Sequence, residues 1–340
     1  MKLRKVLFLI CVFINVNYAY SCTEFLLENV NKDLVIGRSL EFEQDLKCVF
    51  NFFPKNKKNV SIVKNKKAFS WTSKYSFVSI DAFESGPIVD GLNEKGLSLG
   101  VLWFVGAEYP KITTKDLSKI IALEDLGPWI LGSFANVEEV KDSIRNVQIW
   151  AHVIKQLKEI PPFHLSLYDK SGKGIVVEFI DGKIEISENT VGVFTNTPKF
   201  EWQVTNLRNY INLTAVNKEV AKLDEKIIYQ TGQGSGLLGI PGDWTPPSRF
   251  VKIAILKNFV KKTKNIKENV NLAFHLLNTV DIPYGVVRNK EGTKLDYTQW
   301  IIVKDLKNLK IYYRTYQDLN IKSFNLLDKI KNQNLKKIPL

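Results

Sequence analysis

The sequence contains few residues of the types that usually carry disulfides, metals or papain-like catalysis. Among its 340 residues there are three cysteines and three histidines. Cys11 lies in the first apolar run, and if Cys22 works as a free thiol then Cys48 has no partner for a structural disulfide. The histidines lie in apolar, periodic segments without the paired spacing of a zinc site, and we interpret them as packing residues. They are His152, His164 and His275.

Long apolar runs and an excess of acidic residues are also missing. Beyond the run at 6–16, nothing approaches the roughly 18 apolar residues of a membrane span, so we expect no membrane span in the mature protein. Lysine and arginine number 48 against 35 acidic residues, which gives a net charge of +13. The lysines are spread along the chain without a helix-turn-helix, zinc spacing or aromatic RNA-binding motif. The charge therefore does not indicate nucleic-acid binding.

The first 21 residues have the order of parts typical of a secretory signal. Three cationic residues, Lys2, Arg4 and Lys5, precede the apolar run, and Ala19 and Ser21 stand at −3 and −1 of a cut before Cys22. This pattern predicts a cleaved signal peptide at 1–21, a single domain at 22–340, and a secreted or periplasmic protein.

Such a cut would make Cys22 the first residue of the mature chain. Its thiol, with an ordinary pKa of about 8.5, would then share one residue with an α-amine of pKa about 7.7–8.0. A nucleophile with its own base needs no histidine. Two other interpretations stay open: a buried structural thiol and a lipid-anchored cysteine. The second normally has a Leu-like residue at −3 and a small one at −2, where this chain has Ala19 and Tyr20.

Hydrophobic periodicity favours an α+β fold in one domain. Apolar runs at 25–27 and 34–36 around turn-prone residues predict a hairpin that begins at Cys22. Further strands are expected at 77–81, 97–104, 164–168, 174–180, 192–196, 298–303 and 309–315. Helices are expected at 114–126, 137–147, 200–213, 248–260 and 266–280. Helices that follow one another between groups of strands favour packed layers with antiparallel sheets.

Residues 234–239 match the dinucleotide-binding pattern GxGxxG. That site needs a helix to open inside the motif. The prolines at 241, 246 and 247 follow at once and prevent it. We expect a glycine-rich surface loop.

A set of short motifs resembles one known family. The motifs are Cys22-Thr23 and the segments 37–41 (GRSLE), 90–97 (DGLNEKGL), 195–198 (TNTP), 205–210 (TNLRNY) and 241–246 (PGDWTP). Their order and spacing resemble the choloylglycine hydrolase family, which contains conjugated bile acid hydrolases and penicillin V acylases and belongs to the N-terminal-nucleophile (Ntn) hydrolases. The resemblance covers the whole mature chain. It implies an αββα sandwich of two antiparallel sheets between helical layers, with no cofactor and no metal.

The resemblance also implies roles for residues near the nucleophile. Cys22 would attack an amide carbonyl as a thiolate, and its α-amine would carry the proton. Arg38 would lie beside the thiol and lower its pKa. Glu41 stands where the family normally has an aspartate that holds the α-amine or the incoming amide. The extra methylene could cost activity, since a displacement of about 1 Å in a positioning group costs about a hundredfold in rate.

Three further residues complete the implied site. The side-chain N–H of Asn196 and the backbone N–H of Trp103 would bind the oxyanion, and Arg249 would complete the electrostatic frame. Taken alone, Asn196 is more readily explained as a turn former, and the alternative for Arg249 is a helix N-terminal arginine on a solvated face. Tryptophan at 103 resembles the Gram-negative branch, which includes penicillin V acylases. The long stretch between Asn196 and Arg249 resembles a segment that builds a tetramer in Gram-positive members, so we expect a homotetramer.

These observations predict an amidase that cleaves a linear amide between a hydrophobic acyl group and a small amine. Penicillin V-like and N-acyl amides are the leading substrates, followed by glycine- or taurine-conjugated bile acids. The loops at 42–47 and 81–85 are expected to shape the acyl pocket. One alternative is a lipid-tethered envelope protein that binds acyl ligands without turnover. Another is a lipid amidase of the acid ceramidase type, whose relatives expose the cysteine by cutting an internal peptide bond.

Overall fold

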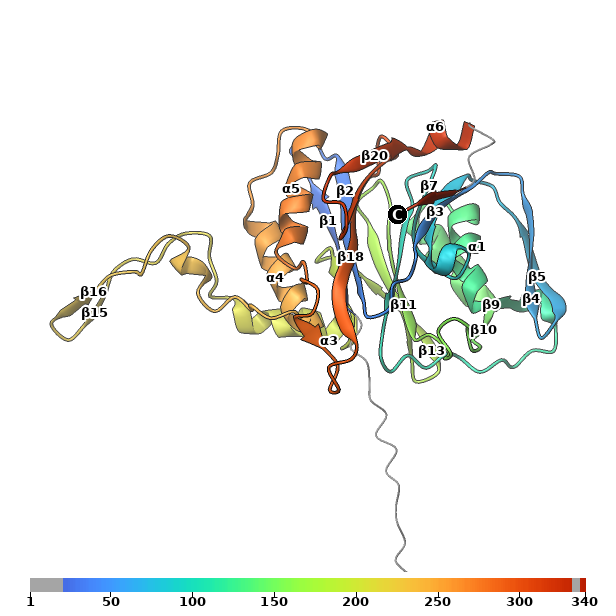
Figure 1. The fold of residues 1–340 in the computed structure, drawn as a ribbon, viewed down its shortest axis with the longest axis horizontal. Helices are drawn as coiled ribbons and strands as arrows, with labels where there is room; N and C mark the ends of the chain where they lie inside the picture. Colours follow the sequence, from blue (N-terminus) through green and yellow to red (C-terminus); the bar gives the residue numbers. More distant parts are fainter. Residues whose placement is uncertain (1–20, 332–336) are drawn as a thin grey trace, which may run out of the picture.

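The computed structural model describes residues 21–331 and 337–340. The predicted signal peptide therefore lies outside the described residues, apart from Ser21. Two antiparallel sheets lie face to face at the centre of the molecule, with helices on the outer face of each (Figure 1). This is the α+β, αββα arrangement that the sequence predicted.

The first sheet carries the start of the domain. Its strands run in the order β14-β1-β2-β18-β19-β20, and β17 pairs with β18. Their bounds are β1 (Ser21–Glu28), β2 (Leu34–Phe42), β14 (Val193–Phe194), β17 (Val287–Arg288), β18 (Leu295–Asp305), β19 (Lys310–Thr315) and β20 (Lys322–Asn325).

The second sheet has eight strands in the order β13-β12-β11-β8-β7-β6-β3-β21. Their bounds are β3 (Val49–Phe53), β6 (Phe77–Asp81), β7 (Ile88–Asn93), β8 (Ser98–Trp103), β11 (Phe163–Tyr168), β12 (Gly174–Ile180), β13 (Lys183–Glu188) and β21 (Lys337–Pro339). Three strand pairs stand apart: β4 (Lys58–Val63) with β5 (Lys66–Thr72), β9 (Ile120–Ala122) with β10 (Gln148–Trp150), and β15 (Ala221–Leu223) with β16 (Lys226–Ile228).

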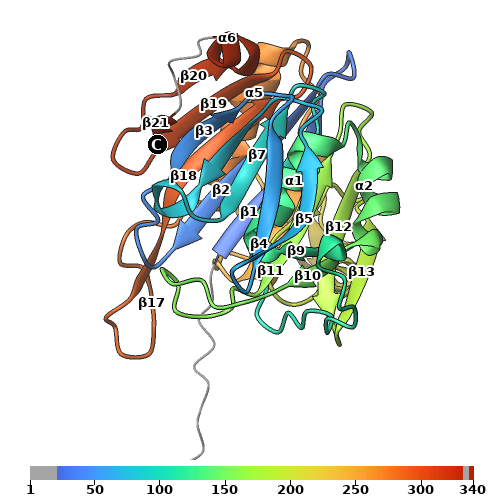
Figure 2. The same cartoon turned by 90° about the vertical axis from the view of Figure 1, so that its right-hand side faces the viewer.

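Helices cover both outer faces. The helices α4 (Pro246–Phe259) and α5 (Ile266–Asn278) pack on the first sheet, and α1 (Leu126–Ser133) packs on the second (Figures 1 and 2). The remaining helices are α2 (Val137–Ser143), α3 (Phe200–Asn206) and α6 (Leu326–Lys331). No helix in the described part of the chain is both long and apolar enough to span a membrane.

The hairpin that begins at Cys22 is confirmed, and local chemistry explains it. The side-chain oxygen of the buried Asn29 accepts hydrogen bonds from the backbone N–H groups of Asn31 and Asp33, at 2.9 and 2.8 Å. This turn sets the register in which Phe25 faces Gly37. A Cβ at Gly37 would lie 2.8 Å from the Phe25 ring, so glycine lets the ring pack directly on the backbone.

The prediction of a helix at 114–126 is wrong. The backbone N–H groups of Thr113 and Thr114 donate to the side chain of Gln148, so the segment begins as a loop. Within this segment, only the single 3₁₀ turns at 117–119 and 123–125 are helical before α1. The run Ile120–Ala122 then pairs with β10 as a short buried strand. A short apolar run does not by itself distinguish a buried strand from a helix, and α1 begins only at Leu126.

The other four expected helices exist with somewhat different bounds. The segment at 137–147 is helical as α2 and a 3₁₀ turn to 146, and 200–213 is helical as α3 and a 3₁₀ turn to 210. The C-terminal pair, α4 and α5, nearly match the expected 248–260 and 266–280. Asn265 caps α5 by accepting from the N–H of Glu268 at 3.0 Å, and the Glu268 carboxylate accepts in return from the Asn265 side chain.

Between α3 and α4 the chain forms an arm that extends far from the two sheets (Figure 1). It contains the β15–β16 hairpin and the glycine-rich segment at 234–239, which forms loop and a single 3₁₀ turn, as expected. Large apolar side chains are exposed along the arm, among them Ile211 at 79%, Tyr229 at 71% and Leu238 at 88% of their surface.

Candidate active site

Cys22 lies at the start of β1, the second strand of the first sheet, and faces the second sheet. Its side chain is 5% exposed. It pairs with Leu40 on β2, and two positions further along Glu24 pairs with Arg38. Because side chains alternate along a strand, Cys22 and Glu24 point to the same face of the sheet.

The Arg38 guanidinium lies beside the thiol, as predicted. Its Nη2 is 3.9 Å from the Cys22 Sγ and also donates to the carbonyl of Val101 at 2.7 Å. Its Nη1 donates to the carbonyl of Val89 at 2.6 Å and to the Asp90 carboxylate at 3.1 Å. With no exposed surface and anchors on two strands of the opposite sheet, Arg38 is a fixed cation at the nucleophile.

Asn196 and Arg249 meet at the backbone of Cys22. The Cys22 N–H donates to Asn196 Oδ1 at 2.6 Å. Arg249 Nη2 donates to the same oxygen at 2.9 Å, and Nη1 donates to the Cys22 carbonyl at 2.6 Å and to Thr23 Oγ1 at 2.5 Å. Arg249 is therefore buried at the inner side of α4, and the interpretation of it as a solvated helix residue is wrong.

The amide nitrogen of Asn196 points toward Trp103. Its Nδ2 donates to the Trp103 backbone carbonyl at 2.8 Å. An amide NH₂ carries two N–H groups, so one is used here. The structure thus brings Asn196 and the Trp103 backbone together next to Cys22, as the resemblance implied.

Glu41 is buried at the end of β2, level with Ser21 in the register. Thr298 donates to Glu41 Oε1 at 3.0 Å, and Oε2 has no hydrogen-bond partner among the described residues. Burial raises the pKa of Glu41 to about 7, although the nearby Arg249 charge opposes the shift. Glu41 therefore lies at the amine side of the site, and its carboxyl is easily protonated near neutral pH.

The thiol itself experiences opposing influences. Burial raises the pKa of Cys22, and Arg38 lowers it. Glu41 acts in the same direction as burial, and Arg249 in the same direction as Arg38, so the net shift is upward. The expected lowering by Arg38 is present, but in the chain that still continues into Ser21 it does not outweigh burial.

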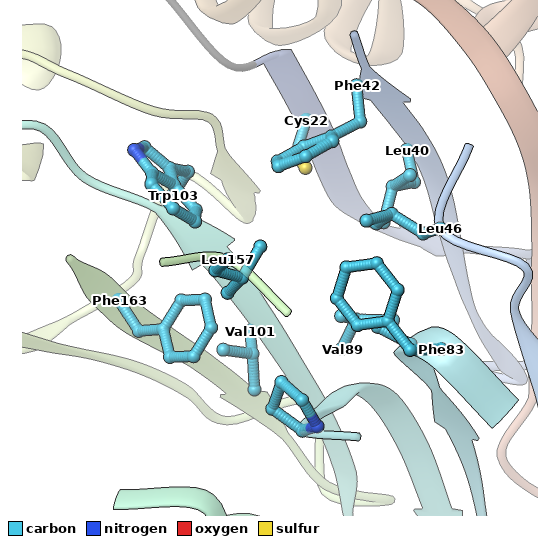
Figure 3. A pocket seen from close by; sticks show the side chains of 12 residues that line it. Cys22, Leu40, Phe42, Leu46, Phe83, Val89, Val101, Trp103, Leu157 and Phe163 are labelled. Atoms are coloured by element: carbon cyan, nitrogen blue, oxygen red, sulfur yellow. The ribbon is translucent and has the colours of Figure 1, made fainter. Parts of the chain in front are cut away.

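An apolar pocket opens directly at the Cys22 sulfur (Figure 3). It encloses about 30 Å³, enough room for roughly two water molecules. Apart from Cys22, the pocket is lined by Leu40, Phe42, Leu46, Ala82, Phe83, Pro87, Val89, Val101, Trp103, Leu157 and Phe163. Both loops expected to shape it, 42–47 and 81–85, contribute lining residues. The indole of Trp103 packs edge-to-face against Phe42 and Phe163, with ring centroids 5.8 and 5.9 Å apart.

Sequence reasoning missed three charged residues behind the nucleophile. Glu24, Asp90 and Lys304 are all buried around Arg38. Asp90 begins the 90–97 motif, but the family resemblance implied no role for it. Lys304 directly follows the apolar run at 300–303, and Glu24 follows Cys22 by two positions, so both patterns could have marked these residues as unusual.

The histidines lie in other surroundings. His164 is buried 3.5 Å from Glu178 and stacks on Phe104, while His152 stacks on Trp150. Cys22 instead forms hydrogen bonds with the side chains of Asn196, Arg38 and Arg249. The nucleophile is thus surrounded by guanidinium and amide groups.

Comparison with known proteins identifies the family. The model of the choloylglycine hydrolase family, described as linear amide C–N hydrolases, matches residues 22–337. The chain belongs to this family. It is accordingly a linear amide hydrolase, and its two-sheet architecture is that of an Ntn hydrolase.

Several relatives are similar over most of their length. A bile salt hydrolase/transferase from Clostridium perfringens is 34% identical over 90% of this chain and 92% of its own. A penicillin V acylase from Pectobacterium atrosepticum is 29% identical over 88% and 80%. The crystal structure of a mutant conjugated bile acid hydrolase from Clostridium perfringens has a TM-score of 0.82 at 31% identity, covering 94% of this chain and 97% of its own. A penicillin V acylase from Agrobacterium tumefaciens shares the fold with a TM-score of 0.76 at 24% identity, covering 94% and 91%.

Proposed function

We propose that Cys22 becomes the N-terminal nucleophile of this amidase once residues 1–21 are removed. The observation that carries the proposal is the geometry around this one residue. Its sulfur borders the apolar pocket and Arg38, while its backbone nitrogen lies 2.6 Å from Asn196 Oδ1. Removal of Ser21 would convert that nitrogen to an amine already held in place, beside the carboxyl of Glu41.

The proposed reaction has two stages. The Cys22 thiol passes its proton to the α-amine and attacks the amide carbonyl, and the resulting oxyanion accepts hydrogen bonds from Asn196 Nδ2 and the Trp103 backbone N–H. The intermediate collapses with cleavage of the C–N bond, and the α-ammonium protonates the leaving amine. Water then attacks the thioester, gives a proton to the α-amine, and releases the carboxylic acid and the free thiol. Arg38 stabilises the thiolate and Arg249 holds the Cys22 carbonyl, so neither takes a proton.

The pocket indicates the kind of acyl group. It is narrow, and four aromatic rings line it: Phe42, Phe83, Trp103 and Phe163. A flat aromatic or slender aliphatic acyl chain suits such a wall better than a polar one. We therefore place penicillin V-like and N-acyl amides first, and conjugated bile acids second, since a steroid would require the loops at 42–47 and 81–85 to open.

The test is mass spectrometry of the mature protein incubated with penicillin V, glycocholate, taurocholate and several N-acyl homoserine lactones. Cleavage should occur for at least one substrate class and should be lost in Cys22→Ala. The unfolding temperature of this variant should equal that of the wild type. Turnover that persists in Cys22→Ala would refute the mechanism. The mass of the N-terminal peptide decides between this enzyme and a lipid-tethered binding protein, because a diacylated Cys22 has no free thiol.

The same proposal covers location and assembly. The order of parts in residues 1–21 supports export to the periplasm or outside the cell. The exposed apolar side chains of the arm support its use as an interface in a homotetramer, since surfaces of this kind usually mark contacts between proteins. Light scattering of the mature protein tests the tetramer, and replacement of Leu238 and Tyr229 by aspartate should dissociate it.

A further inference from the structure

Glu24 is a buried carboxyl group that the proposed reaction does not use. It lies between the two sheets with no exposed surface. Neither of its carboxyl oxygens has a hydrogen-bond partner among the described residues. Buried carboxyl groups without partners are costly, so one that lies two residues from the nucleophile requires an explanation.

The fold makes specific room for this side chain. Gly100 on β8 faces Glu24 across the gap between the sheets, and a Cβ at Gly100 would collide with Glu24 Oε2. The hydroxyls of Ser98 and Ser166 belong to the same polar layer on β8 and β11, where Gly100 and Ser166 are register partners. The second sheet therefore provides a small polar space for the Glu24 carboxyl.

Glu24 and Cys22 lie on the two ends of the same guanidinium. Arg38 Nη1 is 3.9 Å from Glu24 Oε2, and Arg38 Nη2 is 3.9 Å from Cys22 Sγ. The third anion near Arg38 is Asp90, but Lys304 also holds both oxygens of Asp90, at 2.8 and 2.9 Å. The charge of Asp90 is thus shared with Lys304, which leaves Arg38 only partly compensated.

Charge balance in this buried cluster then leaves room for one more anion. Arg38 and Lys304 contribute two positive charges and Asp90 one negative charge. Uncompensated charge is expensive in a low-dielectric interior, so a second negative charge is favoured. The Glu24 carboxylate and the Cys22 thiolate are the two groups in reach of Arg38 that can supply it.

We infer that Glu24 is a positioning residue that competes with the Cys22 thiolate for the charge of Arg38. When Glu24 carries a proton, the thiolate is the favoured partner of the cation. When Glu24 is ionised, it compensates Arg38 and the thiol holds its proton more tightly. The two groups titrate as a coupled pair.

Other charged groups around the pair are consistent with this competition. Burial raises the pKa of Glu24 to about 7, with Lys304 and Arg38 opposing and Asp90 adding to the rise. Glu24 therefore changes its charge near neutral pH. The charges that act on Glu24 are those of Lys304 on β18, Arg38 on β2 and Asp90 on β7, and the Glu24 charge in turn raises the pKa of Tyr168 on β11. The charges that act on Cys22 are those of Arg38, Glu41 on β2 and Arg249 on α4. On the same side of the interior, His164 of β11 is paired with Glu178 of β12.

The test measures the thiol directly. The rate of Cys22 alkylation by iodoacetamide is followed against pH, by the mass of the N-terminal peptide, in the mature wild type and in Glu24→Gln. The inference rests on the proposed role of Cys22. Alkylation needs no substrate, so its outcome is separate from any failure to find turnover.

Glu24→Gln should lower the midpoint of alkylation by about one pH unit, which is about tenfold faster alkylation below the midpoint. Lys304→Met should move the midpoint the opposite way, because Asp90 then compensates Arg38 alone. Glu178→Gln is the matched control, because Glu178 is also buried but accepts a hydrogen bond from the backbone N–H of Phe200. The alkylation profile of this variant should match that of the wild type. A Glu24→Gln midpoint equal to or above that of the wild type would overturn the inference.

A second measurement uses the wild-type protein alone, so it does not depend on whether a variant folds. At a pH where Cys22 is ionised, alkylation removes the thiolate, so Glu24 becomes the remaining partner for Arg38 and should lose its proton. Infrared difference spectra before and after alkylation should show a protonated carboxyl band replaced by carboxylate bands. A difference spectrum without a carboxyl change would equally overturn the inference.

Discussion

The two arginines at Cys22 are both fully buried, yet they have opposite surroundings. Arg38 lies between the sheets and contacts carboxylates in addition to two backbone carbonyls. Arg249 lies on the helix side and donates to neutral oxygens, those of Cys22, Thr23, Asn196 and Trp244. Burial lowers the pKa of both. Around Arg38 the charges of Asp90, Cys22 and Glu24 reverse the shift, so its pKa is raised, while the pKa of Arg249 stays lowered.

This difference gives the two arginines distinct roles, which the sequence motifs alone do not distinguish. Arg38 acts through its charge, which the thiolate and two carboxyl groups share. Arg249 acts through directed hydrogen bonds, which fix the carbonyl of Cys22 and the amide of Asn196. Replacing each arginine should therefore change different observables.

The largest expected effect comes from Arg38→Met. Loss of the cation should raise the pKa of the Cys22 thiol by about two units, which reduces alkylation and kcat/KM at neutral pH about a hundredfold. Alkylation should recover at high pH, where the thiolate forms without help. The alkylation profile against pH measures this, and Arg38→Lys should restore part of the loss. Equal loss at all pH values would show that the role is not electrostatic.

Arg249→Met should affect geometry and stability more than thiol titration. It removes the Arg249 donors from the Cys22 carbonyl and Thr23 Oγ1 and one of the two donors to Asn196 Oδ1. A buried oxygen left unpaired costs about 1–3 kcal/mol. We expect the free energy of unfolding in urea to fall by about 3 kcal/mol and kcat to fall about tenfold. The alkylation midpoint should move much less than in Arg38→Met, and a comparable shift would remove the distinction between the two arginines.

Glu24, which lies beside Arg38, should make the free energy of unfolding depend on pH. The pKa of Glu24 rises from 4.5 to about 7 on folding, so the folded state binds its proton more tightly. The stabilisation is complete below about pH 4.5 and disappears as the pH rises through 7, a loss of about 3 kcal/mol. Urea unfolding at pH 5 and pH 8 should show a smaller difference in Glu24→Gln than in the wild type. An unchanged difference would mean that Glu24 titrates alike in both states.

The smallest effect is expected from Glu41→Asp on the Arg249 side. Aspartate keeps the charge and removes the extra methylene, so activity should be preserved or rise a few-fold. Steady-state kinetics on whichever amide is cleaved best provides the measurement. A collapse of kcat would instead show that the site is adjusted to glutamate, with Thr298 as its partner at 3.0 Å.

The sequence predicted the layers and the nucleophile hairpin well because both depend on local patterns. Alternating apolar residues and the Asn29 turn determine β1 and β2, and the motif order leads to the family and to the six candidate residues. The segment at 114–126 failed because its conformation depends on Gln148 and β10, which are distant in sequence. Likewise, sequence patterns could mark Glu24 and Lys304 as unusual charged residues but could not pair them with Arg38, because these groups meet only when the two sheets stack.

The position of Cys22 within paired strands has a consequence for how the protein acquires its reactivity. Its neighbours Asn196 and Arg249 lie 174 and 227 residues away along the chain. Such distant contacts form late in folding because closing long loops is entropically slow. The alkylation rate of Cys22 therefore reports on a late step of folding. In the unfolded chain Cys22 should react as an ordinary cysteine. Its reactivity should change only when the two sheets, α4 and the 195–198 turn have come together.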